Sequence, residues 1–171
     1  MKGRDIMLRE IRHPILFQGD IKKKNYFEGW YYKQVSKDKR SVISFIPGVS
    51  LFDNDQHSFV QYIFVSLDEN NNKITKTGYL KYPLEAFEFT DSPFSVKVGE
   101  NVFSESMISV KLLNDEININ GTLELGAFTP INKSILMPNI MGYFAYIPKM
   151  ECYHGIISMN HRIDGMLKIN G

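Results

Sequence analysis

Hydrophobic and polar residues alternate along most of this chain with the period of two that is typical of half-buried β-strands. No segment of about twelve residues or more shows a convincing helical period. Only Gly3–Arg12 and Pro130–Met141 have the composition for short helices. The expected strands are Ser41–Val49, Ser58–Leu67, Lys73–Tyr82, Ala86–Thr90, Phe94–Val98, Ser106–Leu113, Ile117–Leu125 and a final hairpin of Glu151–Asn160 with Arg162–Asn170.

Turn residues separate these strands at short intervals, so they predict an all-β antiparallel meander. Asp68–Asn72 is a polar hairpin turn, and Pro47-Gly48 is expected to end or bulge its strand. A meander of eight to ten strands closes into a barrel or packs as a sandwich. Strands that are apolar on both faces favour a barrel, whose interior at this size holds one apolar ligand. Residues 1–171 are expected to form one domain, with short helical or irregular segments at the N-terminus and around 130–141.

Residues 25–33 combine five large aromatic rings, among them the only tryptophan, Trp30, with one carboxylate, Glu28. Each ring buries roughly 150–250 Å² when it packs, so this stretch must lie against a core or a ligand. Alternation places Glu28 on one face with three rings, Tyr26, Trp30 and Tyr32. The carboxylate is therefore either hydrogen-bonded to phenol and indole donors or raised in pKa.

The segment Gly126–Met150 breaks the strand rhythm, because it is long, apolar and interrupted by three prolines. Two interpretations stay open. It covers one end of the barrel, or it is a ligand gate or a surface for a partner.

Charge and cysteine content exclude several classes. The formal net charge is +1, with 20 basic and 19 acidic residues, which argues against nucleic acid as a partner. Lys22-Lys23-Lys24 forms either a solvated loop or a site of attraction to anionic lipid headgroups. The lone cysteine, Cys152, excludes an internal disulfide and fits a small buried hydrophobe better than a nucleophile.

Neither a signal peptide nor an integral membrane segment is recognisable, so we expect a cytoplasmic protein, at most peripheral to a membrane. No Cys/His spacing suggests a metal, and no cofactor is expected.

Several segments resemble the tocopherol cyclase-like family: Tyr26–Lys33 with His13-Pro14 and Phe17–Gly19 before it, Ser44–Val49, His57–Gln61, Met150–Gly155 and Ser158–His161. The resemblance implies a lipocalin-like (calycin-type) architecture that full-length members build from two halves. The chain then corresponds to the N-terminal half, which is completed by a C-terminal half or by a second copy in a homodimer. The plant enzymes of this family close a chromanol ring, as intramolecular lyases, by adding a phenol oxygen to an alkene.

Such a ring closure needs a buried acid, a base and aromatic faces that tolerate a cation. Chemistry alone therefore selects Glu28 or Glu151 as the acid and His154 as a candidate base, although alternation places Glu151 and His154 on opposite faces unless a bulge at Gly155 intervenes. The expected ligand-binding residues are aromatic or polar members of the same segments and their neighbours: Trp30, Tyr31, His57, Gln61, Tyr62 and His161.

Three functions remain open at this stage. The first is binding of a small hydrophobic ligand, such as a prenylquinone, another isoprenoid or a lipid, in the barrel. The second is catalysis of a tocopherol cyclase-type reaction, and the third is a non-catalytic interaction module with a filled barrel.

Overall fold

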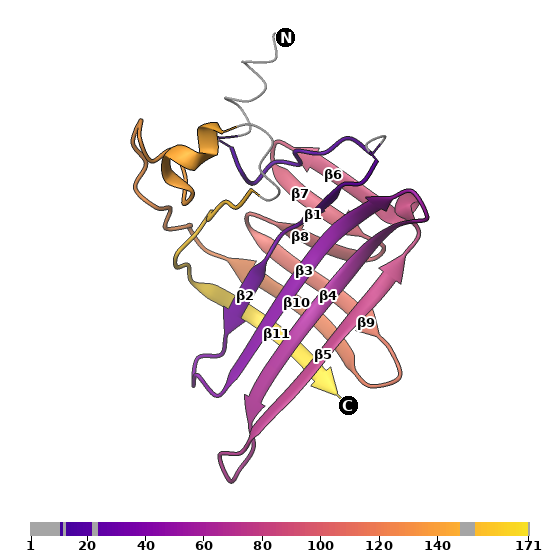
Figure 1. Cartoon of the computed structure of the whole chain (residues 1–171). Helices are drawn as coiled ribbons and strands as arrows, with labels where there is room; N and C mark the ends of the chain where they lie inside the picture. Colours follow the sequence, from indigo (N-terminus) through magenta and orange to yellow (C-terminus); the bar gives the residue numbers. More distant parts are fainter. Residues whose placement is uncertain (1–10, 12, 22–23, 148–152, 171) are drawn as a thin grey trace.

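The computed structural model describes residues 11, 13–21, 24–147 and 153–170 and consists of two antiparallel β-sheets (Figure 1). Figure 1 shows one sheet in front of the other, with the strands of the two layers running across each other. We call the front layer sheet A and the rear layer sheet B.

Sheet A is built around two long strands. Its members are β1 (Phe27–Gly29), β2 (Tyr32–Val35), β3 (Ser41–Phe52), β4 (Asp55–Leu67) and β5 (Lys73–Tyr82). The order is β1-β3-β4-β5, and β2 also pairs with β3. Both β1 and β2 therefore lie along the same edge of β3, one after the other.

Sheet B is a continuous meander in the order β11-β10-β9-β8-β7-β6. Its strands are β6 (Phe87–Asp91), β7 (Phe94–Val98), β8 (Asn101–Ser104), β9 (Met107–Leu113), β10 (Asn118–Leu125) and β11 (Ile163–Asn170). The predicted all-β antiparallel meander is thus confirmed.

Side chains from the facing sides of both sheets form one hydrophobic core. Its largest fully buried members are Phe45 and Tyr62 from sheet A and Phe94 and Phe103 from sheet B. The rings of Phe45 and Phe103 lie 5.9 Å apart, so the two layers pack directly on each other.

Neither sheet closes on itself within the described residues, so closure into a barrel is not confirmed. The connection between the sheets provides a physical reason. After β5, Pro83 and the 3-10 turn η1 (Leu84–Ala86) lead the chain into the other layer, and β6 then pairs with β7. Because a proline has no N–H and a fixed φ, it ends the β5 ladder at this point.

The expectation that Pro47-Gly48 ends a strand is wrong, because β3 continues through both residues to Phe52. Pro47 lies opposite the break between β1 and β2, where its missing N–H removes no ladder bond to either strand. Its carbonyl still accepts a hydrogen bond from the backbone N–H of Trp30, at 3.0 Å.

The predicted final hairpin is also wrong. Residues 153–160 form no strand, and β11 pairs along its whole length with β10. The segment before β11 is instead held by two backbone hydrogen bonds between Thr129 and residues Met159 and Asn160. A second difference is β8 (Asn101–Ser104), which pairs with β9 in a stretch where no strand was predicted.

Helical structure is short. The segment Pro130–Met141 is irregular, and a 3-10 helix, η2 (Gly142–Tyr146), follows it. The prediction for Gly3–Arg12 lies outside the described residues, apart from Ile11. Figure 1 shows the irregular segment and η2 (orange) standing away from the two sheets.

Candidate functional site

Three aromatic rings lie side by side on the outer face of sheet A, the face turned away from sheet B. Phe27 from β1, Phe59 from β4 and Tyr79 from β5 stack with centroid distances of 5.5 Å and 4.8 Å and interplanar angles of 11° and 18°. Phe59 is completely buried, while Phe27 and Tyr79 are 57% and 45% exposed. We call these three residues the aromatic platform.

Glycines explain how the central ring fits closely against the sheet. Gly48 is the residue paired with Phe59 across β3 and β4, and Gly29 is paired with Gly48 across β1 and β3. A Cβ atom at Gly48 would lie 2.6 Å from Cζ of Phe59, and one at Gly29 would lie 3.7 Å from it. The two missing side chains therefore create the space that the Phe59 ring fills.

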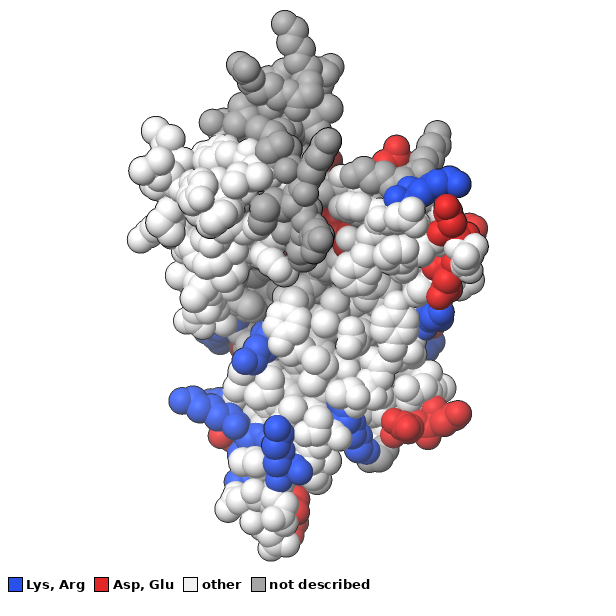
Figure 2. Space-filling model, in the orientation of Figure 1, with Lys and Arg blue, Asp and Glu red and all other residues white. Residues whose placement is uncertain are grey.

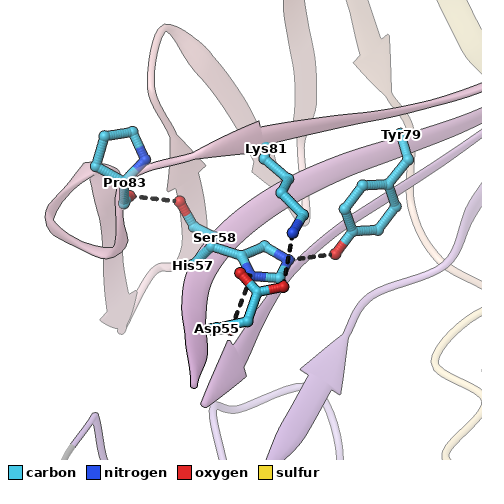
Figure 3. Close-up of polar contacts among 6 residues, drawn as sticks. All are labelled: Asp55, His57, Ser58, Tyr79, Lys81 and Pro83. Carbon is cyan, nitrogen blue, oxygen red and sulfur yellow. Dashed lines mark hydrogen bonds and ion pairs between the residues drawn. The ribbon is translucent and has the colours of Figure 1, made fainter. Parts of the chain in front are cut away.

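A chain of polar side chains begins at the edge of this platform (Figure 3). Nε2 of His57 lies 2.7 Å from the Tyr79 hydroxyl, and Nδ1 of His57 lies 3.1 Å from Oδ1 of Asp55. Oδ2 of Asp55 in turn lies 2.6 Å from Nζ of Lys81. We call the first three residues the Asp55–His57–Tyr79 relay; its histidine is buried and its tyrosine is partly exposed.

The surroundings of Nδ1 determine the tautomer of His57. This nitrogen faces two acceptors, the Asp55 carboxylate at 3.1 Å and the Asp55 backbone carbonyl at 3.0 Å. An acceptor-only environment requires that Nδ1 carry a hydrogen. In the neutral imidazole Nε2 is then an acceptor, so the Tyr79 hydroxyl donates its hydrogen to His57.

The electrostatics keep Asp55 charged and Tyr79 protonated. The hydrogen bond from Lys81 lowers the pKa of Asp55, partial desolvation opposes this, and His57 lowers it further. The pKa of Tyr79 is raised by burial and by the negative charge of Asp55. The site therefore places a carboxylate and a phenol on either side of the His57 ring, an arrangement suited to moving a proton between His57 and the exposed hydroxyl.

Charged side chains avoid the middle of this face. Figure 2, in the orientation of Figure 1, shows Lys, Arg, Asp and Glu mostly toward the margins of the front surface and uncharged residues across its centre. The apolar residues Phe27 and Tyr31 are among the exposed large hydrophobics here. A largely uncharged surface with aromatic rings and one polar relay at its edge is chemically suited to a planar apolar ligand that carries an oxygen.

Three of the predicted ligand-binding residues belong to this face. His57 is in the relay, and Gln61 is paired with Tyr79 across β4 and β5. Tyr31 lies beyond the end of β1, exposed, with its hydroxyl 2.9 Å from that of Ser44.

Two other predicted ligand-binding residues belong to the core between the sheets. Trp30 packs against Phe17, Phe87 and Phe94, and its Nε1 donates a 2.7 Å hydrogen bond to the carbonyl of Ile15. Tyr62 is fully buried, and its ring lies against Gly78.

The predicted acid Glu28 holds backbone in place. Its carboxylate accepts hydrogen bonds from the backbone N–H groups of Gln18 and Gly19, at 3.0–3.1 Å, and from the Tyr26 hydroxyl, at 2.6 Å. Of the phenol and indole donors expected for Glu28, the phenol of Tyr26 is present, while the indole N–H of Trp30 donates to the carbonyl of Ile15 instead. These contacts attach the segment before β1 to sheet A.

Two further candidates, His154 and His161, lie in other surroundings. His154 is exposed, and its backbone N–H contacts Sδ of Met141 at 3.2 Å. His161 packs on Phe128, with Nδ1 3.3 Å from the Ser158 hydroxyl, and burial lowers its pKa. Glu151 and Cys152 lie outside the described residues.

Sequence reasoning missed Asp55, Tyr79 and Lys81. Asp55 and His57 are two positions apart, a spacing that places both side chains on one face of a strand. That signal was available, but the predicted strand began at Ser58, after both residues, whereas β4 begins at Asp55. Tyr79 is 22 residues from His57 and becomes its neighbour only through the pairing of β4 with β5.

The described part of the chain shows neither a metal-binding cluster nor a membrane-spanning helix. It contains no group of three or more His, Cys, Asp or Glu side chains placed to bind a metal ion. It also contains no helix with the length and hydrophobicity needed to cross a bilayer.

Comparisons of the chain with protein-family models, with curated proteins and with solved structures give no match. The geometry of the site is therefore what supports a function for this protein.

Proposed function

We propose that this protein binds a small hydrophobic ligand with a planar ring and an oxygen substituent, of the prenylquinone or isoprenoid class, on the aromatic platform. The observation that supports this proposal is the stack of Phe27, Phe59 and Tyr79, whose two outer rings are exposed, beside the buried His57. A ring placed against such a stack gains apolar burial and offset-stacking contacts. The resemblance to the tocopherol cyclase-like family, with its lipocalin-like architecture and prenylated substrates, favours the same ligand class.

The location differs from the barrel interior that the strand pattern suggested. Large rings occupy the core between the sheets, including Phe45, Tyr62 and Phe103, which are fully buried. The rings of Phe27 and Tyr79 are instead partly exposed to solvent, so we place the ligand at the platform.

Binding is tested by titrating the protein with a short-chain prenylated benzoquinone and recording aromatic NMR resonances. A ligand on the platform shifts the signals of Phe27 and Tyr79. A ligand between the sheets shifts Trp30, the only tryptophan, which lies in the core. Shifts confined to Trp30 contradict the location, and the absence of binding contradicts the function and favours a non-catalytic interaction module.

The matched variants are Phe27→Ser on the platform and Leu113→Ser on β9 of sheet B, both at exposed apolar positions. Phe27→Ser removes one ring of contact and is expected to weaken binding by about 5- to 30-fold, from roughly 1–2 kcal/mol of lost apolar burial. Leu113→Ser is expected to leave the affinity unchanged. Equal effects of the two variants would show that the platform is not the binding surface.

Acid–base catalysis on the bound ligand is a second candidate, which the Asp55–His57–Tyr79 relay favours. Chromanol formation is an isomerisation: a proton adds to the side-chain alkene, the phenol oxygen bonds to the resulting cation, and the phenol proton leaves to a base. One relay that donates and later accepts a proton balances this reaction. Incubation with a prenylated hydroquinone and chromatographic detection of the chromanol tests it, because the His57→Gln variant should form no product above the uncatalysed level. Product formed equally by this variant rules out the relay as the catalyst.

A further inference from the structure

We propose that the Asp55–His57–Tyr79 relay selects ligands by hydrogen-bonding type: protonation of His57 converts the Tyr79 hydroxyl into a donor toward a ligand carbonyl oxygen, and loss of that proton converts it into an acceptor for a ligand hydroxyl. The site would then prefer quinones at lower pH and hydroquinones at higher pH. This inference depends on the proposed binding of a ring ligand at the platform.

The neutral imidazole of His57 defines the first hydrogen-bonding state of the relay. Nδ1–H of His57 donates to Asp55, so Nε2 has a free lone pair and the Tyr79 hydroxyl donates to it across 2.7 Å. The single hydrogen of that hydroxyl is then used. Toward a ligand, the Tyr79 oxygen has only lone pairs to offer, and it accepts a hydrogen bond from a hydroquinone hydroxyl.

The protonated imidazolium of His57 defines the second hydrogen-bonding state of the relay. Imidazolium carries hydrogen on both nitrogens, so Nε2–H now donates to the Tyr79 oxygen and the phenol hydrogen must point elsewhere. Tyr79 is partly exposed and stacks on Phe59, so its hydroxyl stands at the edge of the platform. A quinone carbonyl placed over the platform is the acceptor that this hydrogen suits.

The charged groups nearest the His57 imidazole lie on β4 and β5. Asp55 comes from the same strand, and Tyr79 and Lys81 come from β5. On β3 the residue paired with His57 is Ser50, and on β1 the residue paired with Ser50 is Phe27, neither of which titrates. At the β3–β4 turn Asp53 is paired with Lys24 at 3.2 Å. The carboxylate of Asp55 is thus the charge that directly stabilises the imidazolium, and Lys81 keeps that carboxylate ionised.

The binding experiment uses three tetramethyl-substituted probes of nearly equal shape: tetramethylbenzoquinone, its hydroquinone under anaerobic conditions, and tetramethylbenzene. Affinities are measured from pH 5 to pH 8. Relative to the hydrocarbon, the quinone is expected to gain about 3- to 10-fold in affinity as pH falls, the value of one hydrogen bond. The hydroquinone should gain a similar factor as pH rises.

Variants identify the residues. In Tyr79→Phe and in His57→Gln the quinone-to-hydrocarbon affinity ratio should be independent of pH, and in Asp55→Asn its midpoint should move to lower pH. Tyr143→Phe is the matched control, because Tyr143 is exposed in η2 and its ring packs on that of Phe144 in the same helix. Its pH profile should equal that of the unmodified protein.

A measurement without ligand tests the relay separately. In the free protein the ¹³Cζ resonance of Tyr79 should titrate with the same midpoint as the ¹⁵N resonances of His57, and Nδ1 should be protonated throughout. All three probes binding with the same pH profile would overturn the selection but leave the proposed function intact. No binding by any probe would overturn both, and independent titration of Tyr79 and His57 would overturn the relay itself.

Discussion

At the residue scale, small side chains decide where the large rings lie. Phe59 covers the backbone at Gly48, and Tyr62 covers Gly78, which is its partner across β4 and β5. The Phe59 ring faces out and the Tyr62 ring faces the core, so on each face of sheet A a ring covers a glycine. A ring that shields a glycine backbone from water offsets the poor strand propensity of that glycine.

A methyl group added at Gly48 should destabilise the protein more than one added at Gly29. Gly48→Ala is expected to lower the free energy of unfolding by about 1–3 kcal/mol, because the new Cβ meets the carbonyl oxygen of Glu28 and the Phe59 ring. Gly29→Ala should cost less, since its nearest contact is the movable Cγ2 of Ile46 at 3.1 Å. Urea unfolding of both variants measures the difference, and equal costs would contradict the close approach at Gly48.

Tyr32 gives a residue-scale prediction about alkaline pH. Burial, and secondarily Glu105, raise the pKa of this phenol from its ordinary value of 10.0. The folded state therefore holds the proton more tightly than the unfolded chain does. The resulting stabilisation is complete below pH 10 and is lost as pH rises above it.

Urea unfolding between pH 8 and pH 11 is expected to show a steeper loss of stability in the unmodified protein than in Tyr32→Phe. Parallel pH profiles would indicate that the phenol ionises equally in both states. The variant also loses the 3.3 Å hydrogen bond from the hydroxyl to the carbonyl of Ser104, so the slopes and not the absolute stabilities are compared.

At the element scale, β1 depends on the segment that precedes it. Glu28 binds the backbone of Gln18 and Gly19, and Trp30 binds the carbonyl of Ile15, so β1 and the residue that follows it hold two points of the incoming chain. This is a structural use of two residues whose types first suggested catalysis and ligand binding.

Glu28→Gln tests that structural role. An amide offers one acceptor oxygen where the carboxylate offers two, so part of the contact to Gln18, Gly19 or Tyr26 is lost. We expect a loss of about 1–3 kcal/mol in unfolding free energy and faster amide hydrogen exchange at residues 18–19. Glu124→Gln, at an exposed position of β10, is the matched control and should change stability by less than about 0.5 kcal/mol.

At the scale of the whole molecule, the two sheets share one core and should unfold together. Phe45 and Phe103 contact each other across the layers, with tilted rings. A double-mutant cycle with Phe45→Leu and Phe103→Leu is expected to give a coupling energy of about 0.5–1.5 kcal/mol. The pair Phe45→Leu with Leu113→Ala, the latter 70% exposed, should be additive. A coupling of zero for the ring pair would indicate that the layers are stabilised independently.

Several strands of both sheets could be predicted locally, because alternation depends only on the backbone period. The limits of β5 and β7 were predicted exactly as Lys73–Tyr82 and Phe94–Val98, and the separation of Trp30 from Phe27 and Tyr31 by face followed from odd and even positions. Errors arose where a partner strand decides. Pro47 continues a strand because its neighbours break there, and residues 153–160 are not a strand because β11 pairs with β10 instead.

The sequence by itself determined the secondary-structure class and which side chains share a face of a strand, since both depend on φ/ψ preferences and the period of two. Only the tertiary structure decided that the strands form two crossed layers, that Glu28 binds backbone, and that Tyr79 meets His57. The physical reason is that strand pairing connects residues far apart in the chain, and its register is fixed by the burial of both faces at once, which no local pattern contains.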